Sequence, residues 1–157
     1  MTWWRRVAES RPPDFVIGTA DKPYLRRWWM LPRNTVFNVY LHQFLSSDND
    51  QALHDHMYIN LSYLLEGKYI EHTIAQGGVH HKRLFRAGQW RLRLPTTAHR
   101  IELISALDDT ERFVECWTLF VMGPRMREWG FHCPQGWRHW KDFVAAADIG
   151  KIGRGCE

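Results

Sequence analysis

The sequence predicts an all-β sandwich or barrel, and three observations support this fold class. Short runs rich in β-branched and aromatic residues recur through the middle of the chain, and each ends at a Gly, a Pro or a polar turn cluster. These runs follow one another at nearly even spacing, which is typical of sandwiches and barrels. The length of 157 residues suits one domain with a single sizeable core.

The strand signals extend from residue 35 to residue 123. The run 57–67 stops at Gly67 and the run 68–75 then returns, an arrangement typical of a hairpin. The other expected strands lie within residues 35–45, 80–89, 90–97, 98–105 and 112–123.

The two ends of the chain lack this pattern. Residues 1–12 predict a short helix, and residues 134–147 predict a loop followed by a short helix. No internal repeat or linker is evident, so we expect one domain over residues 1–157. Its barrel core would occupy about residues 24–122, followed by a Trp-rich tail at 123–157.

Composition and charge exclude several classes of partner. The net charge of +4 comes from basic residues in scattered pairs rather than from one basic face, which argues against a nucleic-acid partner. The three cysteines have no metal-binding or redox spacing, which favours a reduced compartment. No signal peptide or long apolar run is visible, so we expect a cytoplasmic protein without a membrane segment. The nine tryptophans suit a core, an interface and a pocket.

Two histidines at the start of an apolar run are the main candidates for a functional site. On a single strand, alternate side chains share a face, so His54 and His56 would point the same way, together with Tyr58, Asn60 and Ser62. An uncharged polar face of this kind suits a wet or metal-bearing cavity inside a barrel. Neutral imidazole is a common ligand for divalent transition metals. The alternative is an ordinary structural histidine pair.

The stretch resembles the first motif of the cupin superfamily, an HxH pair followed by Glu and then Gly. His54, His56 and Gly67 match it, while Asn60 stands at the position of the glutamate. The second cupin motif, Gly then Pro then His, is resembled more loosely by Gly88, Pro95 and His99. The connector at 68–87 contains a further hairpin signal, and its length is compatible with that family.

The resemblance implies a double-stranded β-helix, or jelly roll, with a metal held by His54, His56 and His99. The chain also resembles cupin-like proteins of bacteria and their phages. Three-histidine sites occur in iron-dependent thiol dioxygenases and some diketone-cleaving enzymes of the superfamily, so Fe(II) is the expected ion, with Zn, Mn or Ni as alternatives. Neutral ligands leave the ion its full charge, which favours a small anionic substrate. Asn60 would hydrogen-bond a metal-bound water.

Further residues are candidates for substrate binding and proton transfer. Tyr58 and His42 are the catalytic candidates, although His42 also suits a structural role. Asn60 and Tyr40 are substrate-binding candidates, as are Arg91 and Arg93 if their face points inward. The favoured alternative for the two arginines is a solvent-facing strand that buries its apolar residues, Trp90, Leu92 and Leu94. His80 and His81 should be exposed, and His72 suits either the surface or a pocket wall.

Three functions are compatible with these residues. The leading one is a metal-dependent dioxygenase. The alternatives are an isomerase or epimerase acting on a sugar derivative, and a non-catalytic module that binds a ligand or a metal. A homodimer through an edge strand is expected, because open sheets must protect their edges.

Overall fold

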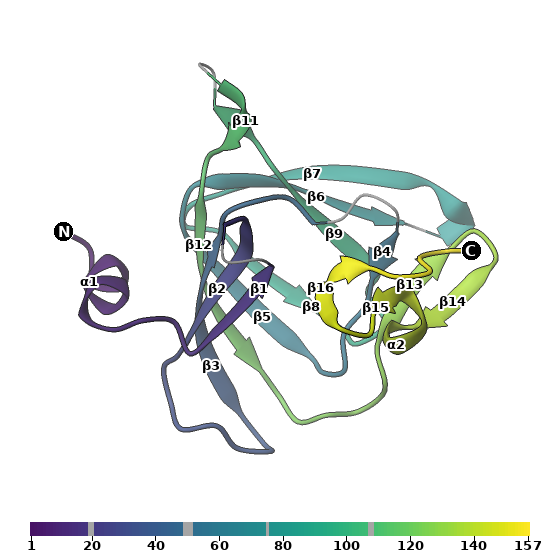
Figure 1. Cartoon of the computed structure of the whole chain (residues 1–157), viewed down its shortest axis with the longest axis horizontal. Helices are drawn as coiled ribbons and strands as arrows, with labels where there is room; N and C mark the ends of the chain where they lie inside the picture. Colours follow the sequence, from purple (N-terminus) through teal and green to yellow (C-terminus); the bar gives the residue numbers. More distant parts are fainter. Residues whose placement is uncertain (19–20, 49–51, 75, 107–108) are drawn as a thin grey trace.

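The computed structural model describes residues 1–18, 21–48, 52–74, 76–106 and 109–157. Within them, two six-stranded antiparallel sheets face each other around a common interior (Figure 1). In spatial order, sheet A contains β1 (Phe15–Gly18), β2 (Pro23–Trp29), β3 (Asn38–Phe44), β12 (Cys116–Met122), β5 (Asn60–Glu66) and β8 (Trp90–Arg93). Sheet B contains β14 (Gly136–His139), β13 (Gly130–Cys133), β4 (Leu53–His54), β9 (His99–Leu103), β6 (Lys68–Ile74) and β7 (His80–Arg86).

The remaining elements are short. Helix α1 (Trp3–Ser10) precedes the sheets, and a 3-10 turn, η1 (Gln76–Gly78), joins β6 to β7. Two small hairpins and one helical turn complete the fold: β10 (Ser105–Ala106) with β11 (Asp109–Phe113), α2 (Trp140–Phe143), and β15 (Val144–Ala145) with β16 (Asp148–Ile152). The all-β prediction is therefore confirmed.

The core divides by chemistry as well as by position. One end of the interior is apolar and joins both sheets through Leu25, Phe44, Leu64, Tyr69, Phe85, Ile101, Leu103 and Cys116. A second cluster contains Tyr40, Tyr58 and Phe120. The interior is also rich in buried polar side chains, which an ordinary sandwich core lacks. One end of the barrel therefore supplies packing, and the rest of the interior holds polar groups.

The hairpin predicted at Gly67 is wrong. β5 pairs with β12 and β8, whereas β6 pairs with β7 and β9, so Gly67 is a corner where the chain leaves sheet A for sheet B. The hairpin predicted inside the connector is present as β6–β7. Strong strand signals either side of a glycine do not reveal which strands pair.

Gly67 allows this corner through its backbone geometry. Its φ is +89°, and a Cβ there would lie 2.6 Å from the Glu115 carbonyl oxygen and 2.7 Å from Cys116 Sγ. Gly67→Ala should therefore lower the free energy of unfolding by at least about 2 kcal/mol, measured by urea denaturation. Gly88→Ala is the matched control, because Gly88 has the same φ of +89° and open space around a Cβ. Equal losses in both variants would contradict a role for the contacts at Gly67.

Both ends of the chain contribute more to the two sheets than the sequence predicted. Helix α1 lies within the predicted 1–12 segment, and its Trp4, Val7 and Ala8 cover the outer face of sheet A against Trp28, Leu41 and Trp117. Beyond the predicted core, β1 extends sheet A, and β13 and β14 extend sheet B. In the 134–147 segment, a strand precedes the short helix instead of a loop.

The cysteine interpretation is corrected by a disulfide. Cys133 and Cys156, 23 residues apart, are bonded, and only Cys116 is a free thiol among the described cysteines. Sequence spacing does not reveal this pair, because the two cysteines are 23 residues apart and meet only in the folded chain. Neither described helix has the length and apolar content needed to cross a membrane.

Candidate metal centre

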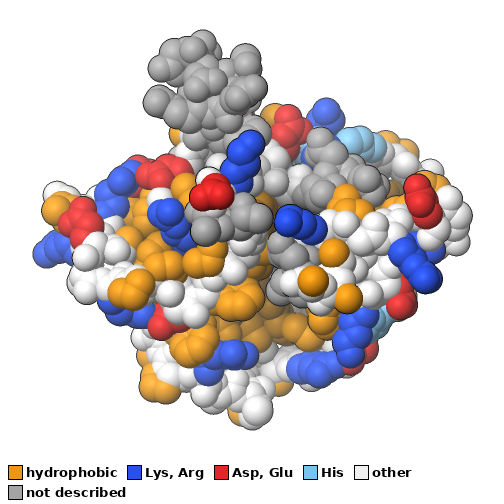
Figure 2. All heavy atoms as spheres, in the orientation of Figure 1, with side chains coloured by type: hydrophobic (Ala, Val, Ile, Leu, Met, Phe, Trp, Pro, Cys, Tyr) orange, Lys and Arg blue, Asp and Glu red, His pale blue; other side chains and the backbone are white. Residues whose placement is uncertain are grey.

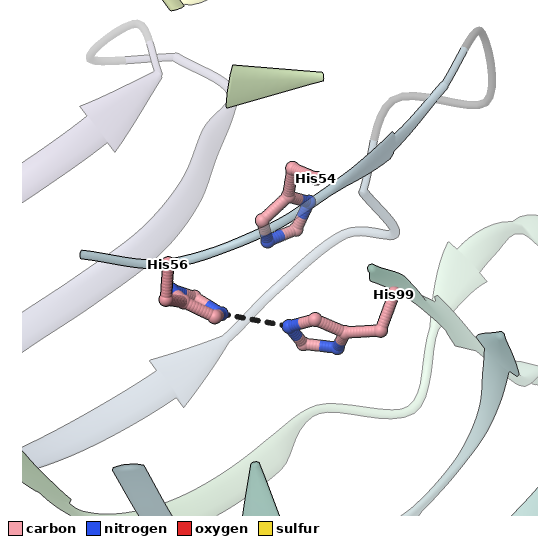
Figure 3. Close-up of side chains that lie close together, drawn as sticks. All are labelled: His54, His56 and His99. Carbon is pink, nitrogen blue, oxygen red and sulfur yellow. Dashed lines mark hydrogen bonds between the residues drawn. The ribbon is translucent and has the colours of Figure 1, made fainter. Parts of the chain in front are cut away.

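Three imidazoles converge inside the barrel (Figure 3). His54 ends β4 and lies directly opposite His99 on β9, and His56 follows two residues later in the loop to β5. The nitrogen donor atoms of the three rings all lie within 4.8 Å of one another. His56 Nε2 and His99 Nε2 are the nearest pair, at 2.7 Å. The structure therefore brings together the three histidines that the two motifs indicated.

The expectation that His54, His56, Tyr58, Asn60 and Ser62 share one strand face is wrong. His54 belongs to sheet B, β5 begins at Asn60 in sheet A, and the chain crosses between the sheets at 55–59. The HxH pair therefore points inward from two places, His54 from the end of β4 and His56 from the crossing segment. The rings still converge because β9 lies beside β4.

The donor set fits a divalent transition metal. Burial lowers the pKa of His56 and of His99 well below the usual value, with further lowering from neighbouring histidines and Arg93. Both rings are therefore neutral at pH 7, the form that binds metals. Two imidazole nitrogens on one ion, each about 2.0–2.1 Å from it, are about 3 Å apart. The 2.7 Å between the Nε2 atoms is close to that spacing.

Glu71 stands behind His99. Its Oε1 lies 3.3 Å from His99 Nδ1, although the two atoms do not form an aligned hydrogen bond. A carboxylate in this place favours a proton on Nδ1 and leaves Nε2 free for a metal. Glu71 is itself buried and is held by Arg93 and Arg91, whose Nε atoms each donate to it at 2.6 Å.

The predicted orientation of β8, with its arginines facing solvent and its apolar side chains buried, is wrong. The structure shows the alternative, in which the arginines point inward. Arg93 is 2% exposed and also donates to Ser62 Oγ and the Tyr69 hydroxyl. The apolar set, Trp90, Leu92 and Leu94, is more than half exposed. The interior tolerates these arginines because Glu71 binds both guanidinium groups, and Arg91 is partly exposed to solvent. One of the two positive charges is therefore compensated, and the Nε donor of each arginine is already used.

Asp55 lies between the two motif histidines and is fully buried. It accepts hydrogen bonds from Gly130 N–H, Arg127, His132 and the Trp137 indole, all contributed by the C-terminal segment. Burial raises its pKa, but these hydrogen bonds outweigh burial and lower the pKa to about 2. A carboxylate thus ties the segment that carries His54 and His56 to the β13–β14 hairpin.

His42 has a defined tautomer. Its Nε2 accepts a hydrogen bond of 2.8 Å from Arg27 Nε, which can only donate. Burial and the neighbouring Arg27 lower the pKa of His42 well below its usual value, so the ring is neutral and carries its proton on Nδ1. Within the described residues, that Nδ1 has no hydrogen-bond partner.

The two tyrosine candidates are buried beside the histidines. The Tyr58 ring stacks on His56 with centroids 5.9 Å apart, and Tyr40 stacks on His42 at 6.0 Å. Burial raises the pKa of Tyr58, which keeps its phenol protonated. Tyr63 instead packs against Trp90, away from these rings.

Polar atoms remain unpaired in the interior. Asn60 is 1% exposed, and neither its amide oxygen nor its nitrogen has a hydrogen-bond partner among the described residues. The same holds for Thr118 Oγ1, whose residue pairs directly with His42 across β12 and β3. Buried polar groups are rarely left without partners unless they serve a ligand, an ion or water. The expected hydrogen bond from Asn60 to a metal-bound water stays a prediction.

The other histidines lie apart from this centre. His72 is buried and hydrogen-bonds Glu102 and His80 at 2.6 and 2.9 Å. His80 and His81 are exposed, as expected. His72 therefore forms a separate polar cluster with residues of β7 and β9.

Sequence reasoning missed Glu71, Asp55 and Arg27. The pair Arg91 and Arg93, two residues apart, was the available signal for Glu71, because two inward arginines require a buried carboxylate. No comparable signal existed for Asp55, whose partners lie 72 to 82 residues away in the chain.

Comparison with known proteins gives information about the fold, through solved structures alone. No family model and no curated protein matches the chain. Among solved structures, an Fe(II)-HppE with the alternative substrate (S)-1-HPP matches with a TM-score of 0.52 and 12% identity, over 73% of this chain and 56% of that one. A mannose-6-phosphate isomerase-like protein from Ralstonia eutropha matches with a TM-score of 0.51 and 15% identity, over 71% of this chain and 92% of that one.

A third match is an oxalate decarboxylase from Bacillus subtilis with Mn(II) centres, with a TM-score of 0.50 and 13% identity. It covers 78% of this chain and 30% of that one. Identities this low carry the fold alone, and the three proteins have different chemistries. Together with the two facing sheets, these matches show that the chain has the cupin jelly-roll fold.

Proposed function

We propose that His54, His56 and His99 bind one divalent transition-metal ion and that the loaded protein is an Fe(II)-dependent dioxygenase of a small anionic substrate. The observation that carries the proposal is the convergence of three imidazole donor atoms within 4.8 Å of one another. Three protein ligands leave coordination positions open, which distinguishes a reactive site from a closed structural one.

The residues around the triad would have distinct tasks. A bound Fe(II) supplies Lewis acidity and redox chemistry. Glu71 would fix the tautomer of His99, and Asp55 would hold the segment that carries His54 and His56. Tyr58, protonated beside His56, can donate a hydrogen bond or a proton to a molecule near the centre.

Metal analysis tests the first half of the proposal. Purified protein should contain about one transition-metal ion per chain, and His99→Ala should lose most of it because only two imidazoles remain. His80→Ala is the control, since His80 is exposed and hydrogen-bonds His72 rather than a residue of the triad. Inductively coupled plasma mass spectrometry measures both. Metal retained by His99→Ala would contradict the triad as the binding site.

Oxygen uptake tests the second half. Protein reconstituted with Fe(II) should consume oxygen with at least one member of a panel of thiols and of 2-oxo or enolisable acids. Metal binding without oxygen uptake across the panel would favour the non-catalytic module over the dioxygenase. Isomerisation of a sugar derivative without oxygen uptake would favour the isomerase.

The cytoplasmic location stays a prediction. The bond between Cys133 and Cys156 argues against it, because disulfides favour an oxidising compartment over a reducing one.

The homodimer also stays a prediction. It draws support from β8, an edge strand of sheet A whose Trp90 and Leu92 are exposed.

A further inference from the structure

Arg27 differs from the other inward arginines in lacking a carboxylate. It lies on β2 directly opposite His42 on β3, and its Nε donates to His42. Within the described part of the chain, that bond is the only hydrogen bond of its side chain, and no Asp or Glu forms an ion pair with it. By contrast, Glu71 pairs with both inward arginines of β8, Arg91 and Arg93.

The surroundings of Arg27 are aromatic. Its guanidinium carbon lies 4.9 Å from the centre of the Tyr40 ring and 5.7 Å from that of Phe15. Ring faces attract a cation but offer less compensation than a carboxylate. Burial accordingly lowers the pKa of Arg27. Arg27 is therefore a half-buried cation, and four of its five guanidinium N–H groups can still donate to an anion.

Arg27 belongs to the wall of the interior that leads to the triad. His42, its hydrogen-bond partner, stacks on Phe120 with ring centroids 5.0 Å apart, and Phe120 lies 6.4 Å from the His56 ring. Tyr58, which stacks on His56, packs in one cluster with Tyr40, whose ring lies 4.9 Å from the Arg27 guanidinium carbon. The face drawn in Figure 2 is hollowed near its centre, and hydrophobic side chains line the hollow between sheet A and the C-terminal strands.

We propose that Arg27 binds the carboxylate of a small organic acid and so orients the substrate toward the three histidines. This proposal rests on the proposed function and replaces Arg91 and Arg93 as the anion-binding residues, because both of those guanidinium groups are already bound to Glu71. The guanidinium matches carboxylate and phosphate equally well in shape, but a single cation compensates the charge of a monoanion fully and that of a phosphate dianion only in part. His42, held in its Nδ1–H form by the same arginine, would supply a second donor further inside.

The test is a titration of the full-length protein with propionate, followed by the NMR signal of the Arg27 side-chain N–H and by that of the His42 backbone N–H. The second signal is also present in Arg27→Gln, and it reports on the same place because His42 lies directly opposite residue 27. Propionate should shift both signals, and neutral propionamide should shift neither. Arg27→Gln should weaken propionate binding about 10-fold or more, because charge-assisted hydrogen bonds are lost. Arg26→Gln removes the same charge from the opposite face of β2 and should stay within about twofold of the parent.

Several outcomes would overturn the proposal. Equal propionate affinity in Arg27→Gln and the parent, equal binding of propionamide, or tighter binding of inorganic phosphate than of propionate would each do so. If Arg27→Gln does not fold, an unshifted Arg27 signal in the parent is the deciding result. His99→Ala separates this proposal from the metal: binding of propionate that persists without metal supports Arg27, and binding that vanishes with the metal assigns the carboxylate to the ion instead.

Discussion

Glu71→Ala is expected to lower the free energy of unfolding by about 3–5 kcal/mol, measured by urea denaturation. The variant leaves Arg93, 2% exposed, as a buried charge without its carboxylate, and it removes the partner of Arg91. Breaking one side of a buried pair costs more than the pair itself contributes, because the remaining charge stays desolvated.

Two further variants make this result specific to the buried pair. Glu102→Ala is the matched control, because Glu102 is 40% exposed and pairs with His72 on sheet B, so its loss should cost under about 1 kcal/mol. Glu71→Met combined with Arg93→Met should recover part of the lost stability, since the fully buried charge of Arg93 is removed together with its partner, and the remaining Arg91 is 28% exposed. A Glu71→Ala variant as stable as Glu102→Ala would contradict the importance of the buried carboxylate.

Glu71 also links stability to the metal centre. Glu71→Gln keeps the size of the side chain and an acceptor oxygen but removes the charge that faces His99 Nδ1 at 3.3 Å. Loss of a group behind a metal ligand typically weakens metal binding about 10- to 100-fold. Competition with a chelator measures this effect independently of any catalytic activity.

Asp55→Ala should cost about 4 kcal/mol of unfolding free energy and weaken metal binding as well. The variant leaves four donors without their acceptor: Gly130 N–H, Arg127, His132 and the Trp137 indole. Gly130 N–H is a buried donor, and leaving such a donor unpaired costs about 1–3 kcal/mol, while the other three donors are partly exposed and add smaller amounts. Because Asp55 lies between His54 and His56, the segment that carries both rings should lose its attachment to the C-terminal hairpin.

The same unfolding and chelator measurements on two other variants complete this test. Asp55→Asn, which can accept but carries no charge, should fall between Asp55→Ala and the parent. Asp21→Ala, at an exposed position, should stay within about 0.5 kcal/mol of the parent. If Asp55→Ala keeps both the parental stability and the parental metal affinity, the hairpin does not support the segment that carries His54 and His56.

The sequence by itself determined the fold class and the identity of the three histidines. Short strand signals at even spacing predict a β-sandwich or barrel whichever strands pair with each other. The reason is that these signals reflect the local preference of residues for strands and turns. Two motifs placed His54, His56 and His99 at positions that the jelly roll then brings within 4.8 Å.

Only the tertiary structure decided which faces of the strands point inward and which charges meet. Alternation along β8 separates Arg91 and Arg93 from Trp90 and Leu92, but it does not say which set is buried when the interior itself is polar. That choice depended on Glu71, about twenty residues away on another sheet. Asp55 and its partners, and the bonded cysteines, likewise meet only through topology, since contacts between distant parts of a chain leave no local pattern in it.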